Sequence, residues 1–157
     1  MIRDLRRLGD KLEGTAENKD RLKLWLRLLT CTIKMEHVIA NGLREQFGTT
    51  LPRFDVMAAL DRAEGDLTMG ELSKWLLVSN GNVTGVVSRL VKDGFVERNR
   101  AGDRRIQNVR LTTKGRQEFK AMAAAHENWV NHMLRRLSER EVKALTTQLS
   151  KLKEVQE

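Results

Sequence analysis

The chain has 157 residues, of which 40% are hydrophobic and 32% charged, and its formal net charge at pH 7 is +8. This length and composition predict a soluble globular protein with one core, and the single cysteine excludes an internal disulfide framework. Residues 1–14 lack the apolar segment of a secretory signal, and no uncharged run approaches the roughly 18–20 residues of a membrane span. We therefore expect a cytoplasmic protein with no membrane partner.

The first half of the chain predicts two helices. Residues 1–19 show no clear periodicity and form an N-terminal extension, either a frayed tail or an arm that orders on a partner. A long amphipathic helix is expected from about Asp20 to Gln46, ended by Gly48. A second helix begins around Pro52, a residue favoured in the first helical turn, and Gly65 is its expected stop.

A helix-turn-helix is predicted next. Thr68 and Glu71 form a capping box, in which the Thr hydroxyl and the Glu carboxylate each accept from the other residue's backbone N–H. The short helix that it opens stops at Val78-Ser79. Ser79 then caps a second helix, Asn80 to Lys92, which has one apolar face and ends at Asp93-Gly94.

A two-stranded ribbon follows, with strands at 95–98 and 108–111 and a turn at Gly102-Asp103. Thr112 or Thr113 can cap the helix after it. Ser138 and Glu141 form a second capping box, which opens a last helix with one apolar stripe: Val142, Leu145, Leu149, Leu152 and Val155.

These elements define a mainly α fold: a winged helix-turn-helix with a small β-hairpin wing and a helical dimerisation region. We assign residues 51–112 to the DNA-binding region, and residues 20–50 and 113–157 to the dimerisation region. The terminal helices have two interpretations, since they either cover the core of a monomer or pair with a second copy. A symmetric dimer would match a palindromic DNA site.

Positive charge is confined to the predicted DNA-binding segment. Residues 67–116 carry 10 Lys and Arg against 4 Asp and Glu, whereas the segments before and after have a net charge of +1 each. A focused positive field attracts a polyanion through neutralisation of its phosphates. The alternative for a charge run is a solvated face.

Polar residues of the second helix and the wing are the candidate DNA contacts. Asn can read adenine, Arg can read guanine, and Thr can contact a phosphate or a thymine methyl. We expect Arg104 or Arg105 to enter a minor groove, and Asp103 to fix the wing by pairing with a neighbouring Arg. The candidates are Ser79, Asn80, Asn82, Thr84, Ser88, Arg89, Arg98, Arg100, Arg104 and Arg105.

Three runs carry a family resemblance: Leu67-Thr-Met-Gly-Glu-Leu-Ser-Lys, Val78-Ser-Asn-Gly-Asn-Val-Thr-Gly and Asp93-Gly-Phe-Val. Together with Asp103-Arg-Arg105, Val109 and Leu111-Thr-Thr-Lys-Gly115 in the wing, they resemble the MarR family of bacterial regulators over roughly residues 20–155. The resemblance implies a triangular homodimer whose winged lobes read adjacent major grooves of double-stranded DNA. It also implies transcriptional repression relieved by a small effector, and the second run is closest to members that sense aromatic acids or their coenzyme A thioesters.

An effector pocket is expected where the first long helix and the helix after Pro52 meet the helix after the wing. An apolar slot with a few polar groups suits an aromatic acid, and Arg21, Lys23, Arg27 and Lys34 are cations near enough in sequence for a coenzyme A ester. For each lining residue, plain core packing is the alternative. The candidates are Trp25, Arg27, Leu29, Ile33, His37, Phe54, Met57, His126 and Trp129.

Other chemistries have weaker support. Cys31 lies mid-helix beside apolar residues and is expected to be a packing residue, with a redox switch as the alternative. His37, His126 and His132 lack short metal-ligand spacing, so no metal site and no cofactor are expected, with a metal-sensing regulator as the alternative. The sequence contains no nucleotide-binding loop or nucleophile motif, which argues against an enzyme. An architectural DNA-bending role would need apolar wedges, and the wing tip offers only Ile106.

Overall fold

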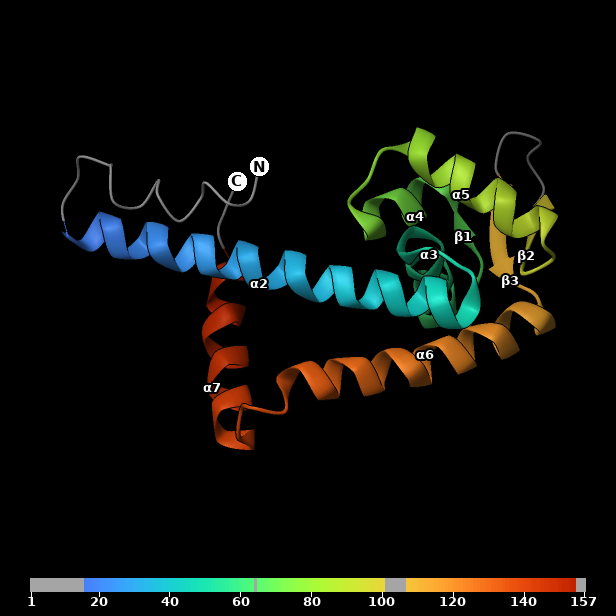
Figure 1. Cartoon of the computed structure of the whole chain (residues 1–157). Coiled ribbons are helices and arrows are strands. Elements are labelled where there is room, and N and C mark those ends of the chain that lie inside the picture. Colours follow the sequence, from blue (N-terminus) through green and yellow to red (C-terminus); the bar gives the residue numbers. More distant parts are fainter. Residues whose placement is uncertain (1–15, 64, 101–106, 155–157) are drawn as a thin grey trace.

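The computed structural model describes residues 16–63, 65–100 and 107–154, and Figure 1 shows their arrangement. The predictions for the N-terminal extension and the wing tip, including Asp103, Arg104 and Arg105, lie outside the described residues. The elements in order are α2 (Ala16–Phe47), α3 (Leu51–Arg62), β1 (Leu67–Thr68), α4 (Met69–Leu76), α5 (Asn80–Lys92), β2 (Val96–Arg100), β3 (Gln107–Leu111), α6 (Thr113–Leu134), α7 (Glu139–Ser150) and the 3-10 helix η2 (Lys151–Glu154).

Two long helices, α2 and α6, extend away from a lobe made of α3, α4, α5 and the strands (Figure 1). They pack closely at Gly42, where an added Cβ would lie 2.6 Å from the indole ring of Trp129. Gly48 ends α2 with a φ of +59°, as its position predicts. In this fold, therefore, Gly42 leaves room for the Trp129 ring, and Gly48 lets the chain turn from α2 into α3.

One hydrophobic core lies inside the winged lobe. Its fully buried side chains come from every element that surrounds it, and the ends of α2 and α6 nearest the lobe contribute as well. They include Leu43, Val56, Met57, Leu72, Val83, Val87, Leu90, Val96, Val109 and Met122. The three buried residues of α5 recur at helical spacing, so the face of α5 on which they lie is fixed against the core.

The helix-turn-helix forms as predicted at its first cap but differs at its turn. The backbone N–H of Thr68 donates to Glu71 Oε2 at 2.8 Å, and the Thr68 hydroxyl accepts from the Glu71 N–H at 3.2 Å. The Glu71 carboxylate accepts hydrogen bonds from the backbone N–H and the hydroxyl of Thr68, and these two bonds lower its pKa. The first helix ends at Leu76, earlier than predicted, because Leu77 turns the chain with a left-handed φ of 53°. Ser79 is the N-cap residue of α5 in backbone conformation, but its side chain makes no capping hydrogen bond.

The wing belongs to a sheet of three strands rather than the predicted two. The antiparallel order is β1-β3-β2, with Leu67 opposite Val109 in one pair and Arg98 opposite Val109 in the other. The two-residue β1 is too short to show periodicity in the sequence. It ties the start of the helix-turn-helix to the wing.

Two further expectations are wrong. Gly65 does not stop α3, which ends at Arg62 because Ala63 is already extended, with φ −69° and ψ 131°. Cys31 is exposed rather than packed. It faces away from the inner side of α2, where Leu28, Leu29 and Ile33 are partly buried.

The last helix has no partner within the described chain. Thr112 caps α6, and the capping box of Ser138 and Glu141 opens α7, both as predicted. However, α7 buries none of its residues, and the apolar stripe that continues from α7 into η2 is exposed: Val142, Leu145, Leu149 and Leu152. Among the described residues, no helix is long and apolar enough to cross a membrane.

Candidate nucleic-acid interface

The solvent-facing side of α5 carries the polar residues predicted to read DNA. While Val83, Val87 and Leu90 hold one face in the core, the side chains of Ser79, Asn82, Thr84, Ser88 and Arg89 are exposed. Asn80 is the first residue of α5, and its side chain lies outside the described residues. The core contacts of α5 therefore present a continuous polar face to a partner.

Two glycines on this exposed side have no packing role within the chain. Among the described residues, a Cβ added at Gly81 or Gly85 would meet no atom within 4 Å, in contrast to the tight contact at Gly42. A glycine inside a helix costs about 1 kcal/mol relative to alanine. Because Gly85 is three residues from Asn82 and four from Arg89, it lies on the same stripe as two candidate reading residues. The bare backbone leaves room for close approach by another molecule.

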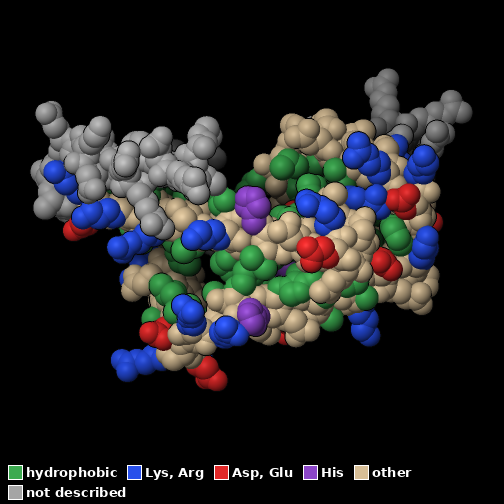
Figure 2. Space-filling model, viewed as in Figure 1, with side chains coloured by type: hydrophobic (Ala, Val, Ile, Leu, Met, Phe, Trp, Pro, Cys, Tyr) green, Lys and Arg blue, Asp and Glu red, His purple; other side chains and the backbone are tan. Residues whose placement is uncertain are grey.

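Arg98 joins the wing to α5. Its guanidinium donates to the Ser88 hydroxyl at 2.8 Å, so two predicted DNA contacts from different elements lie together. Arg100 ends β2, with a side chain outside the described residues. Basic side chains gather over α5 and the strands on the face shown in Figure 2.

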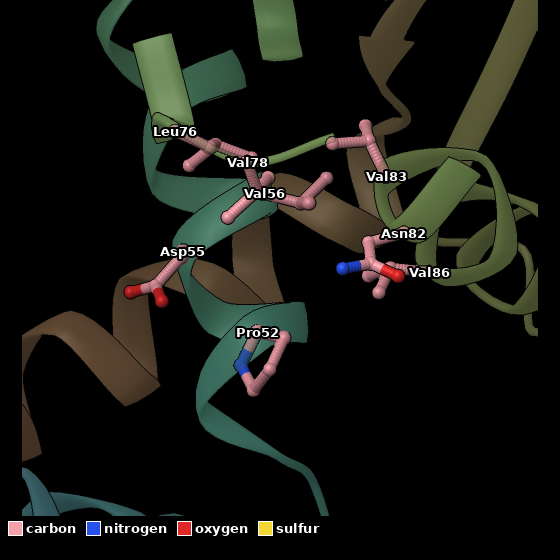
Figure 3. A pocket seen from close by; sticks show the side chains of 8 residues that line it. All are labelled: Pro52, Asp55, Val56, Leu76, Val78, Asn82, Val83 and Val86. Atoms are coloured by element: carbon pink, nitrogen blue, oxygen red, sulfur yellow. The ribbon is translucent and has the colours of Figure 1, made fainter. Parts of the chain in front are cut away.

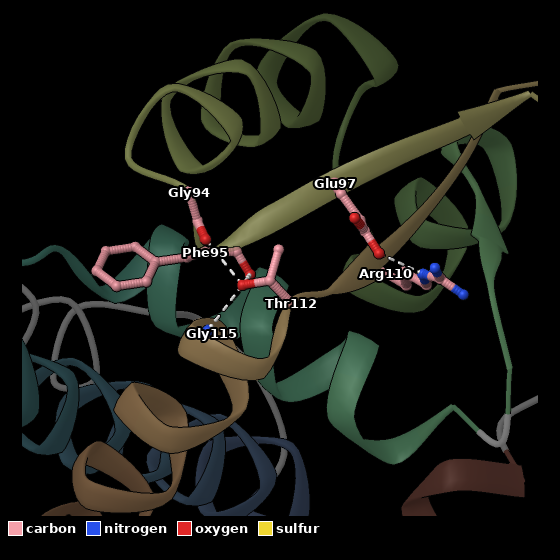
Figure 4. A network of polar contacts seen from close by, with 6 residues as sticks. All are labelled: Gly94, Phe95, Glu97, Arg110, Thr112 and Gly115. Carbon is pink, nitrogen blue, oxygen red and sulfur yellow. Dashed lines mark hydrogen bonds and ion pairs between the residues drawn. The ribbon is translucent and has the colours of Figure 1, made fainter.

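The root of the wing is fixed by a network centred on Thr112 (Figure 4). The Thr112 hydroxyl donates to the carbonyl of Gly94 at 2.7 Å and accepts from the N–H of Gly115 at 2.9 Å. A Cβ at Gly115 would lie 1.9 Å from the carbonyl oxygen of Phe95, so only glycine fits there. The Leu111–Gly115 run thus locks β3 and α6 against the end of α5.

Three polar contacts that sequence reasoning missed stiffen the same region. Arg110 donates to Glu97 at 2.6 Å across the strands, in register with the β2–β3 pairing (Figure 4). Arg53 of α3 pairs with Asp93 at 2.5 Å, and Lys114 donates to the Asp93 carbonyl at 2.9 Å. Cross-strand register could have suggested the first pair, but no local pattern links Arg53 to a residue so distant in sequence.

The predicted effector residues divide into two groups in this structure. The Phe54 ring lies 5.0 Å from His126 and 5.6 Å from Phe119, centroid to centroid, while Met57 is buried and Trp129 covers Gly42. Burial lowers the pKa of His126. The second group lies on α2: Leu29 and Ile33 are partly buried, and Trp25, Arg27 and His37 are exposed.

A pocket of about 340 Å³ lies elsewhere, between α3, the α4–α5 turn and α5 (Figure 3). Its walls are mostly apolar, and Asp55 and Asn82 are its polar residues, standing on opposite sides. Burial and the nearby Glu36 carboxylate raise the pKa of Asp55 to about 6. The sequence signal for this site was an acid inside the apolar run Phe54-Asp-Val-Met57, which we did not single out. The lining residues are Pro52, Asp55, Val56, Leu76, Val78, Asn82, Val83 and Val86.

Comparison with known proteins identifies the fold. The family model described as MarR family matches residues 47–106. The crystal structure of a MarR family transcriptional regulator from Silicibacter pomeroyi is 33% identical, covers 91% of this chain and 100% of its own, and has a TM-score of 0.75. The chain belongs to the MarR family.

Two other relatives extend the comparison. The transcriptional activatory protein BadR from Rhodopseudomonas palustris is 32% identical over 108 residues, a match that spans 64% of this chain and 59% of the relative. A mutant MarR from E. coli complexed with operator DNA is 26% identical, covers 88% of this chain and 99% of its own, and has a TM-score of 0.75. The family and these relatives are transcriptional regulators, so this MarR-family chain is a regulator and not an enzyme.

Proposed function

We propose that this MarR-family protein binds a palindromic DNA operator as a homodimer, and that it represses transcription until a small aromatic acid or its coenzyme A thioester releases it. The observation that carries DNA binding is the α5 face: exposed Asn82, Thr84 and Arg89 beside open glycines, with Arg98 held to Ser88. These residues supply hydrogen-bond donors and acceptors that can pair with those that the base edges present in a major groove to an inserted helix.

The exposed apolar stripe of α7 supports the homodimer. Three large side chains of α7 and Leu152 of η2 are 37–50% exposed in the single chain, and Leu24 and Trp25 of α2 are 54% and 58% exposed. Burying a leucine contributes about 1.5–3 kcal/mol, so a second copy that covers these helices would gain substantial stability. A two-fold dimer would then place two α5 helices about one DNA turn apart.

The effector is proposed to bind near Phe54, His126 and Trp129. The rings of Phe54 and His126 lie 5.0 Å apart, and Trp129 is one turn further along the helix that carries His126. The lowered pKa of His126 favours the neutral imidazole, which can accept a hydrogen bond from a phenol or an acid. A ligand there would release DNA only by binding the DNA-free dimer better. Aromatic carboxylates and their coenzyme A thioesters, screened against the bound operator, test this part of the proposal.

DNA binding is tested with the full chain and an operator selected from random duplexes. Replacing Arg104 and Arg105 together with Ala should weaken binding and reduce the salt slope by up to about 1.8, since each phosphate contact contributes about 0.9. The control replaces Lys120 of α6 and Arg135, the residue that follows this helix. It removes the same charge outside the proposed interface and should change the slope little. An equal effect of the two double variants would refute the wing assignment.

The dimer is tested by the pair Leu145→Asp and Leu149→Asp, which should yield a monomer in sedimentation, whereas Lys143→Asp on the same helix should not. If the double variant stays dimeric, α7 is not the interface.

Two outcomes would favour the alternative functions. Strong bending of DNA without sequence preference would favour an architectural protein instead. Release by peroxide that disappears in Cys31→Ser would establish redox sensing, for which the exposed thiol is accessible.

A further inference from the structure

The pocket between α3 and α5 differs in chemistry from the proposed aromatic-acid site. Six of its eight lining residues are apolar, and its volume of about 340 Å³ falls in the range of small-molecule sites. It shares no lining residue with the Phe54, His126 and Trp129 cluster. A ligand of this pocket would therefore differ from the proposed aromatic acid.

The charge of the pocket restricts that occupant. Asp55 has no cationic partner among the ion pairs of the described residues, and the acidic Glu36 is near enough to act on it. A partly buried carboxylate without a counter-ion attracts a cation and repels an acid. The hydrocarbon walls formed by Val56, Leu76 and Val86 favour an apolar body attached to that cation.

We propose that this pocket binds a small amphipathic amine, with its ammonium group at Asp55 and its hydrocarbon body against the valines of α5. Asn82 and Val86 belong to both the pocket and α5, so a bound amine would contact the helix that presents the reading face (Figure 3). The regulatory consequence, weaker operator binding, rests on the proposed function. Binding of the amine to the protein without DNA does not depend on the proposed function.

The surface beside the pocket is also apolar. Next to the pocket, at the end of α4 and in the α4–α5 turn, Trp75, Leu77 and Val78 are 49%, 91% and 45% exposed, and Val78 is itself a lining residue. Hydrophobic side chains are visible at the surface of this region in Figure 2. A ligand with an apolar body would thus meet exposed apolar side chains beside the site.

The test uses three probes with the same aromatic body and different charge: 2-phenylethylamine, 2-phenylethanol and phenylacetate. Titration calorimetry of the full chain at pH 8 and low salt should give an affinity for the amine at least tenfold higher than for the alcohol, and no measurable binding of the acid. Amine-dependent NMR shifts should fall on the methyl groups of Val56, Val78, Val83 and Val86. Asp55→Asn should abolish the preference for the amine, and Asp61→Asn, an exposed acid on the same helix, should keep it.

Equal affinity for amine and alcohol in the native protein would overturn the proposal, as would a preference that survives Asp55→Asn. Operator binding is measured separately. If the amine binds and depends on Asp55 but no duplex is bound, the pocket stands and the proposed function fails. If the operator is bound and the amine is not, the proposed DNA binding stands and the amine pocket fails.

Discussion

Replacing Gly85 with Ala should make the protein more stable and a weaker DNA binder at once. Gly85 lies inside α5, where glycine costs about 1 kcal/mol relative to alanine, and a Cβ there meets nothing within 4 Å. Its φ lies outside the left-handed region, so alanine adds no backbone strain. We expect the free energy of unfolding to rise by about 0.5–1 kcal/mol.

The loss of DNA affinity follows from the same open space. If α5 enters a major groove, the new methyl group occupies the space between Asn82 and Arg89 that the bases or phosphates would approach. Loss of one well-placed base contact costs about 1–3 kcal/mol, so we expect operator binding to weaken by roughly 5- to 140-fold.

The assays are urea unfolding followed by circular dichroism and operator titration by fluorescence anisotropy. Gly70→Ala is the matched control, because Gly70 lies in α4 and an added Cβ meets only the Thr68 hydroxyl, at 4.0 Å. It should stabilise the fold by a similar or smaller amount without changing operator affinity more than about twofold. A destabilised Gly85→Ala protein, or one that keeps native affinity, would refute the reasoning.

Three further predictions concern stability. Asp55→Asn should stabilise the protein at pH 8, because the pKa of Asp55 is raised from 3.8 to about 6 and ionisation of this carboxyl therefore destabilises the folded state. Full burial would make the gain in unfolding free energy about 3 kcal/mol, and partial exposure reduces it to about 1–1.5 kcal/mol. The gain should fade as the pH falls from 6 to 4. Urea midpoints that show a constant gain across that range would contradict this. Leu77→Gly should raise the melting temperature slightly, because a leucine with a φ of 53° costs about 1–2 kcal/mol, partly offset by the greater freedom of glycine in the unfolded chain; a lower melting temperature would count against this strain. Gly115→Ala should cost about 2–3 kcal/mol, since its Cβ would collide with the Phe95 carbonyl, and unchanged calorimetric stability would show that the wing root can shift.

Local patterns were enough to predict much of the fold. Capping boxes at Thr68 and Ser138, the stop at Gly48 and the apolar face of α5 all depend on residues within four positions of each other. Such interactions are encoded in the chain before it folds. The same local grammar placed Asn82, Thr84 and Arg89 on one exposed face, because the opposite face had to be buried.

The family signature in the wing also had a local form, but its physical reason became clear only in three dimensions. Thr112 and Gly115 can be recognised in the sequence. However, the Gly94 carbonyl that accepts from Thr112 and the Phe95 carbonyl that limits Gly115 lie some 20 residues earlier in the chain. Sequence spacing can show that a glycine is present. Only the folded backbone shows which atom would occupy the place of its Cβ.

Tertiary structure alone decided the remaining features. Periodicity along α2 cannot say which apolar positions another helix covers, so Cys31 was expected in the core and is exposed. Likewise, the pocket at Asp55 is assembled from α3, the α4–α5 turn and α5, and its carboxylate acquires a raised pKa only when those elements exclude water from it. The sequence by itself determined the presence of the helices, the two capping boxes and the polar face of α5, because these depend on neighbours along the chain. Burial, cavities and perturbed acids depend on neighbours in space, and these were decided by the tertiary structure.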